Sequence, residues 1–271
     1  MSRRPVLEFA TRTDTGRVRA HNEDSVAVSA EHGLAVLADG MGGYSAGEVA
    51  SGIATTVIRE TIESRLAKRG WRRPLRAGAM QQMLGAAVKL ANSAILATAQ
   101  RQPEYAGMGT TLVAALFHHD RVTIAHVGDS RAYRLRQGGI EQLTRDHSLL
   151  QEQVDAGLIS ADEARFSDHK NLVTRAVGIE QPIDVETHEH RVAVGDLYLL
   201  CSDGLSDMLS EQEIASLAPA GGADLVHAAE ALVRSANDNG GLDNISVILA
   251  RVESCDAAPS GLFGRIANWI K

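Results

Sequence analysis

Four aspartates interrupt or border strongly apolar segments, where an isolated charge is costly to bury. One such segment, GLAVLADGMGG, ends its aliphatic stretch in aspartate and then turns to glycine. A single Asp-Gly pair is a common turn, because glycine tolerates positive φ and aspartate bonds to its own backbone. Several such carboxylates at strand ends would repel one another unless a cation neutralised them. The four are Asp39, Asp129, Asp203 and Asp243.

The chemistry that this set of acids favours is the binding of a hard divalent cation. Carboxylate and carbonyl oxygens without cysteine are the ligands of Mg²⁺ or Mn²⁺. Gly40 directly follows Asp39, and without a side chain its carbonyl oxygen could approach an ion as a further ligand. The nearby glycines Gly42, Gly43 and Gly47 would keep this approach open.

The segment RVRAHNED supplies groups for an anionic substrate. Arg19 can hold a phosphate through two N–H groups, while Glu23 and Asp24 can hold metal-bound waters in place. Taken alone, this segment is typical of a polar turn with solvated charges. Together with the aspartates it predicts a site for phosphate chemistry.

Strands and helices must bring these residues together, and the apolar periodicity predicts both. Helical spacing covers 46–68 and 77–99, and two shorter helices are expected at 211–217 and 224–236. Because strands and helices come in blocks rather than in strict alternation, we expect an α+β fold with antiparallel sheets. Strands are expected at 6–10, 25–29, 34–38, 110–117, 122–127, 132–135, 140–143, 183–188, 197–201 and 245–252.

Composition is typical of a soluble enzyme. The 271 residues are 44% hydrophobic, so we expect one large domain with a full core. The balance of 34 acidic to 27 basic residues, a net charge of -7, argues against a nucleic-acid or anionic-membrane surface. We expect neither a signal peptide nor a membrane span. Cys201 and Cys255 form no metal-spaced or redox pair, which favours a cytoplasmic setting.

Six motifs carry a family resemblance: RAHNED at 19–24, ADGMGG at 38–43, MGTT at 108–111, GDSR at 128–131, SDG at 202–204 and Asp243-Asn244. In order and spacing they resemble the metal-dependent protein serine/threonine phosphatases of type 2C, in their bacterial form. The resemblance extends from about Glu8 to Val252, which is nearly the whole chain.

The resemblance implies a four-layer αββα sandwich, in which two antiparallel sheets pack face to face with a helix pair on each outer side. It implies a phosphatase domain over 1–253, with a polar insert at about 145–170 in the position of the family's flap beside the active site. In this insert, AGLISADE is typical of a helix end followed by a Ser-capped helix start. Residues 254–271 would form a linker and a short amphipathic segment, which docks on the domain or anchors it to a partner or membrane surface.

The resemblance also implies a centre of two Mn²⁺ or Mg²⁺ ions per chain. Asp39 would bridge the ions, the Gly40 carbonyl would bind the first, and Asp203 and Asp243 would bind the second. Asp129, together with Asp203, resembles the family's site for a weaker third ion.

The implied reaction is hydrolysis of phosphoserine and phosphothreonine in proteins by a water that two metal ions activate. The catalytic residues would be Asp39, Asp203, Asp243 and Arg19, the last stabilising charge on the phosphoryl oxygens. Animal members carry histidine after the Asp-Gly pair as general acid, whereas this chain has Met41, so a water on the third ion is our hypothesis for that role. We expect a monomer that acts on phosphoproteins and opposes a bacterial serine/threonine kinase.

Two other functions stay open at this point. A phosphatase for one signalling protein, such as an anti-sigma-factor antagonist, would share the same chemistry. A catalytically dead metal-binding scaffold could share the fold, but such a copy has no need to retain Arg19, Asp39, Asp203 and Asp243 together.

Several histidines could be considered as ligands of a zinc site or as the base of a serine nucleophile. The pairs His118-His119 and His188/His190 lack a third ligand nearby in sequence, so we expect exposed strand histidines. His147 does not combine with a serine into a nucleophile and its base.

Overall fold

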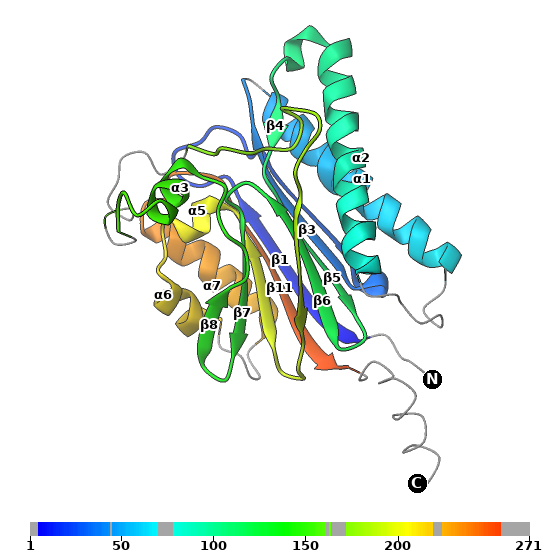
Figure 1. The fold of residues 1–271 in the computed structure, drawn as a ribbon. Helices are drawn as coiled ribbons and strands as arrows, with labels where there is room; N and C mark the ends of the chain where they lie inside the picture. The colour runs from blue at the N-terminus through cyan, green and yellow to red at the C-terminus, as the bar shows by residue number, and fades with distance from the viewer. Residues whose placement is uncertain are drawn as a thin grey trace.

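Two antiparallel β-sheets pack face to face and carry helices on their outer surfaces (Figure 1). The computed structural model describes residues 5–43, 45–69, 78–160, 163, 172–218 and 224–255. One sheet has the strand order β1-β11-β10-β7-β8 and the other β2-β3-β5-β6-β9, with the short strand β4 paired to β3. The strands are β1 (Val6–Asp14), β2 (Asp24–Ser29), β3 (Leu34–Met41), β4 (Gly109–Thr110), β5 (Leu112–His118), β6 (Arg121–Val127), β7 (Arg131–Arg136), β8 (Gly139–Gln142), β9 (Glu186–Arg191), β10 (Leu197–Cys201) and β11 (Ile245–Ser254).

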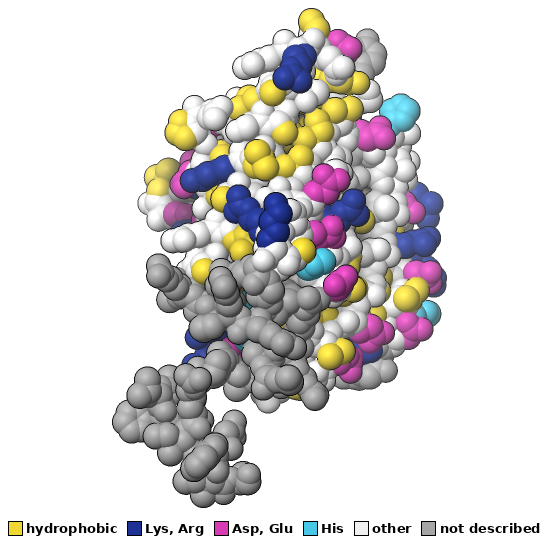
Figure 2. All heavy atoms as spheres, turned by 90° about the vertical axis from the view of Figure 1, so that its right-hand side faces the viewer, with side chains coloured by type: hydrophobic (Ala, Val, Ile, Leu, Met, Phe, Trp, Pro, Cys, Tyr) yellow, Lys and Arg dark blue, Asp and Glu magenta, His cyan; other side chains and the backbone are white. Residues whose placement is uncertain are grey.

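Helices cover both sheets. The long helices α1 and α2 pack on the β2-β3-β5-β6-β9 sheet, while α5, α6 and α7 lie on the side of the other sheet (Figure 1). Figure 2 shows the α1–α2 side, where charges of both signs are interspersed with apolar side chains. The predicted α+β class and the layered sandwich are confirmed. The helices are α1 (Ala46–Arg69), α2 (Ala79–Arg101), α3 (Leu149–Asp155), α5 (Asp203–Ser206), α6 (Glu211–Leu217) and α7 (Leu225–Asp238), with 3-10 turns η1 (Ala30–His32) and η2 (Pro103–Tyr105).

The core forms three apolar layers because each sheet is covered on both faces. All seven residues of β5 are buried, as a strand between a helix layer and a second sheet requires. Between the sheets, Phe117 packs edge-on against Tyr198 with ring centroids 5.1 Å apart and against Phe9 at 6.4 Å. This central layer holds the two sheets in a fixed relation, and therefore also their ends.

Three local expectations were wrong. β3 continues through Asp39 and Gly40 instead of ending at Ala38, because β4 pairs with it there. β9 begins at Glu186 rather than at 183, because its pairing with β6 begins there, opposite His126. His118 and His119 are buried rather than exposed.

The ends of the insert are partly described. α3 is capped by Ser148, and the predicted Ser160 cap is confirmed: its hydroxyl accepts a hydrogen bond from Glu163 N at 3.2 Å. The rest of the second insert helix and the amphipathic segment beyond Cys255 lie outside the described residues. In the part of the chain that the structure describes, no helix combines the length and apolar character of a membrane span.

Replacing Phe117 with alanine tests the central layer. Because this ring is fully buried between two aromatic neighbours, Phe117→Ala should lower the free energy of unfolding by about 3–5 kcal/mol in urea titrations. Leu90→Ala, at a side chain that is 50% exposed, should change it by less than about 0.5 kcal/mol. Equal losses for the two variants would contradict this packing.

Candidate metal centre

The predicted acids come together at one end of the sandwich. Asp39 of β3 lies directly opposite Asp24 of β2. Asp203 begins α5 immediately after β10, and Asp243 lies just before β11, the neighbour of β10 in its sheet. Asp129 follows the end of β6. The ends of β3, β10 and β6 therefore place carboxylates from distant parts of the sequence around one point, in the upper part of Figure 1.

Asp39 lies at the middle of this cluster. Burial raises the pKa of Asp39 well above its usual range, and the charges of Asp24, Asp203, Asp129 and Asp243 raise it further. Burial also raises the pKa of Asp203 strongly, and among the neighbouring charges that of Asp129 contributes most to this rise. At neutral pH such a cluster needs either bound protons or a bound cation, because the carboxylates destabilise one another when all are ionised.

Two further acids titrate abnormally. Burial raises the pKa of Asp24 to about 6, although hydrogen bonds from Ser246 and Ser202 act in the opposite direction. Burial and the charge of Asp146 raise the pKa of Asp129 to about 6. The charges of Asp24 and Asp129 in turn raise the pKa of Asp39 and Asp203, so the structure brings these four acids together.

The donor set fits a hard divalent cation. Asp203 Oδ1 is buried and has no hydrogen-bonding partner among the described residues, which leaves a charged oxygen available to an ion. The backbone at Gly40 is crowded: an added Cβ would lie 2.2 Å from the carbonyl oxygen of Gly47 and 2.6 Å from that of Glu23. Only glycine fits at position 40, where the backbones of Glu23 and Gly47 approach so closely.

Arg19 and Glu23 border the cluster. The guanidinium of Arg19 donates to Asp243 Oδ2 at 2.6 Å, and this hydrogen bond raises the pKa of Arg19. Its side chain is 54% exposed, so it can also meet a substrate. Burial raises the pKa of Glu23, whose carboxylate oxygen Oε2 lies against Gly47.

Hydrogen bonds from uncharged side chains hold the acidic segments together. Asn244 Oδ1 accepts from Glu23 N at 2.8 Å, and its Nδ2 donates to the carbonyls of Thr15 and His21. Ser202 Oγ donates to Asp24 Oδ2 at 2.9 Å. The sequence alone does not reveal these supports, because Asn and Ser next to aspartate are also typical of ordinary turns.

Thr111, between β4 and β5, also holds acidic segments in place by hydrogen bonds. Its hydroxyl accepts from Asp39 N at 3.2 Å and shares a 2.7 Å hydrogen bond with Ser130, the residue after Asp129. The MGTT motif contained this residue, and its role follows only from the fold.

A pocket of about 460 Å³ adjoins the acids. Asp129 and Asp203 lie on its wall beside residues of α3 and of the segment before α6. Arg131, which also lines it, donates to Asp146 from two nitrogens, from Nε to Oδ1 at 3.0 Å and from Nη2 to Oδ2 at 2.6 Å. The pocket gives a bulky group access to the acidic cluster from the side of the insert.

Comparisons with known proteins agree with this geometry. The protein phosphatase 2C model matches residues 15–249. The serine/threonine protein phosphatase PstP of Mycobacterium tuberculosis is 40% identical over 252 residues, 93% of this chain and 46% of that protein. The serine/threonine phosphatase stp of Listeria innocua is 38% identical over 241 residues, 88% of this chain and 93% of that protein.

A solved structure extends the likeness to three dimensions. The catalytic domain of PstP, in complex with 2 manganese ions, has a TM-score of 0.79 at 39% identity, covering 92% of this chain and 99% of that domain. This chain therefore belongs to the protein phosphatase 2C family, and the family resemblance predicted from its motifs is confirmed. The chain spans about half the length of PstP, 46%.

Asp203→Asn should have opposite effects on stability without and with metal. In chelator the variant should melt higher, by about 2–4 °C for each kcal/mol of relieved repulsion. Mn²⁺ should raise the melting temperature of the native chain and have little effect on the variant, since binding to the folded state stabilises it. Thermal melts with EDTA and with Mn²⁺ measure both.

The same variant predicts a pH dependence. Because folding raises the pKa of Asp203, its protonated form stabilises the fold at low pH, and this contribution is lost as the pH rises through the folded pKa. Asparagine does not ionise, so the advantage of Asp203→Asn in chelator should grow with pH. An advantage that stays constant across the pH range would contradict the assigned repulsion.

Proposed function

We propose that this chain hydrolyses phosphoserine and phosphothreonine in proteins with two bound Mn²⁺ or Mg²⁺ ions. The convergence of five aspartates carries the proposal: burial and neighbouring carboxylates raise the pKa of Asp39 and Asp203, and divalent cations would let these groups ionise at neutral pH. The manganese-bound relative supports the choice of ion. We assign the phosphatase to 1–253, which the family match to 15–249 supports, and the linker and amphipathic segment to 254–271.

The chain's own residues divide into ligands and substrate contacts. Asp39 would hold both ions, with the Gly40 carbonyl on the first and Asp203 and Asp243 on the second. Asp129 with Asp203 would hold a weaker third ion. When bound, the ions would lower the pKa of a water and neutralise the phosphoryl oxygens.

Arg19 would hold the phosphoryl group. Asp243 fixes one of its N–H groups at 2.6 Å, so the exposed remainder of the guanidinium is oriented toward the cluster before substrate arrives. Glu23 and Asp24 would orient waters rather than bind ions directly; the hydrogen bond from Ser202 to Asp24 supports a fixed position. Met41 carries no proton to donate, so the leaving group takes its proton elsewhere.

The substrates follow from the family and from the access to the site. The pocket of about 460 Å³ beside Asp129 and Asp203 is where we propose that the phosphorylated side chain enters. We propose a cytoplasmic monomer that opposes a serine/threonine kinase, in line with the net charge of -7 and with two cysteines whose spacing forms no metal or redox motif. The presence of Arg19 beside the aspartates, where it can meet a substrate, favours an active centre over a dead scaffold.

Hydrolysis assays test the activity directly. Turnover of an aryl phosphate and of a phosphothreonine peptide should require Mn²⁺ or Mg²⁺, stop with chelator, and fall at least about 100-fold in Asp243→Asn. Asp184→Asn, at an exposed aspartate, is the matched control and should retain native turnover. A folded protein that hydrolyses neither substrate with either metal would refute the activity.

The leaving group distinguishes the role of Asp129. If the third ion supplies a proton donor, Asp129→Asn should slow the phosphothreonine peptide more than the aryl phosphate, whose leaving group needs no proton. The ratio of the two kcat values, native against variant, measures this. Equal slowing of both substrates would remove Asp129 from proton transfer.

A further inference from the structure

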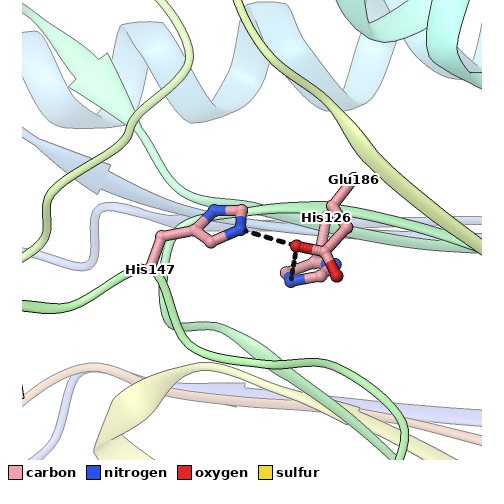
Figure 3. Close-up of side chains that lie close together, drawn as sticks. All are labelled: His126, His147 and Glu186. Carbon is pink, nitrogen blue, oxygen red and sulfur yellow. Dashed lines mark hydrogen bonds and ion pairs between the residues drawn. The ribbon is translucent and has the colours of Figure 1, made fainter. Parts of the chain in front are cut away.

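A second group of potential ligands lies beside the metal centre. His126, His147 and Glu186 point toward one another from β6, the start of the insert and β9 (Figure 3). Their ligand atoms lie within 4.8 Å of one another. His147 Nε2 is 3.1 Å from Glu186 Oε2, and His188 Nε2 is 2.6 Å from Glu186 Oε1. Two imidazoles and a carboxylate at this spacing raise the question of a zinc site.

The hydrogen-bond directions argue against metal. Gly128 N–H donates to His147 Nδ1 at 3.1 Å, so the neutral ring carries its proton on Nε2 and donates it to Glu186. A histidine bound to metal through Nε2 carries the proton on Nδ1, which would face the N–H of Gly128. Arg145 O accepts from His126 Nε2 at 2.8 Å, and a proton moved to His126 Nδ1 would find no acceptor among the described residues.

The same directions give His147 a definite task. Its side chain accepts from Gly128 N–H, and its backbone N–H donates to Gly128 O at 2.9 Å, so one residue satisfies both polar groups of Gly128. Gly128 turns with φ 103, and an added Cβ there would lie 2.7 Å from Thr111 Cβ. The next residue is Asp129, whose direction this turn sets.

The two hydrogen bonds between His147 and Gly128 form a clamp, and Glu186 fixes this clamp to the sheet. It lies directly opposite His126 in the β6–β9 pair, and its carboxylate receives the proton of His147. Burial acts to raise the pKa of Glu186, but hydrogen bonds from His147 and His188 leave it lowered, so the acceptor stays ionised. The ring of His147 is thereby held at both nitrogens and can position Gly128.

We propose that His147 is a positioning residue for Asp129: its Nδ1 fixes the Gly128 amide and so aims the Asp129 carboxylate at the third-ion site. This inference rests on the proposed function, because it gives Asp129 an ion to hold. His147 O also accepts from Thr174 N at 2.8 Å, so the clamp lies where the two ends of the insert meet.

Two variants separate the two nitrogens of the ring. His147→Asn keeps an acceptor at the Nδ1 position and loses the bond to Glu186. His147→Gln keeps a donor near the Nε2 position and loses the acceptor for Gly128. The Mn²⁺ concentration for half-maximal activity should rise about 10-fold or more in His147→Gln and stay close to native in His147→Asn. Calorimetric Mn²⁺ titration should show the weakest site lost in the first variant and retained in the second.

Thermal melts of both variants and an Asp129→Asn reference complete the test. The positioning role would be overturned if the Mn²⁺ concentration for half-maximal activity rose in each variant only as far as its melting temperature fell. In that case His147→Asn and His147→Gln would differ in Mn²⁺ dependence no more than they differ in stability. The positioning role would also be overturned if the native chain bound Zn²⁺ while its Mn²⁺ sites were filled and both His147 variants lost this Zn²⁺ binding. His126, His147 and Glu186 would then form a metal site. If Asp129→Asn itself leaves Mn²⁺ binding and its activation unchanged, the third-ion role fails; if native chain shows no metal-dependent turnover at all, the proposed function fails.

Discussion

Repulsion among buried carboxylates is the constraint on which the rest of this structure depends. Asp39, Asp24, Asp203, Asp129 and Asp243 bring five carboxyl groups to one end of a well-packed sandwich, where burial and the neighbouring carboxylates raise the pKa of Asp39 and Asp203. A fold pays such a cost only where something else stabilises the ionised groups. Divalent cations are the simplest source of that stabilisation. Bound cations would also activate a water and neutralise phosphoryl oxygens, which is the chemistry that phosphate ester hydrolysis needs.

The surrounding structure keeps the acids close despite their charge. The central apolar layer fixes the sheets, and uncharged donors then fix each acidic segment: Thr111 at Asp39, Ser202 at Asp24 and Asn244 at the backbone of Glu23. Glycines at the contact points let the backbones approach to distances that a side chain would forbid. The inferred clamp of His147 on Gly128 extends the same design to Asp129.

The sequence pointed to these acids because each interrupts or borders an apolar segment, a pattern with few explanations in a core, and the structure brings them to one end of the sandwich. Asp39, Asp203 and Asp243 were identified this way, and the motifs supplied the layer order. The continuation of β3 through Gly40 was missed, since pairing with β4 depends on residues far along the chain. The burial of His118 and the direction of the His147 bonds were missed for the same reason: hydrogen-bond partners such as Thr123 and Gly128 are known only once the strands are paired.

Anomalous diffraction from crystals soaked in Mn²⁺ tests the central claim most directly. Strong peaks should lie on both sides of the Asp39 carboxylate, with Asp203 and Asp243 as ligands of the second ion. Crystals without any peak at this cluster, or with a single ion that does not contact Asp39, would contradict the account.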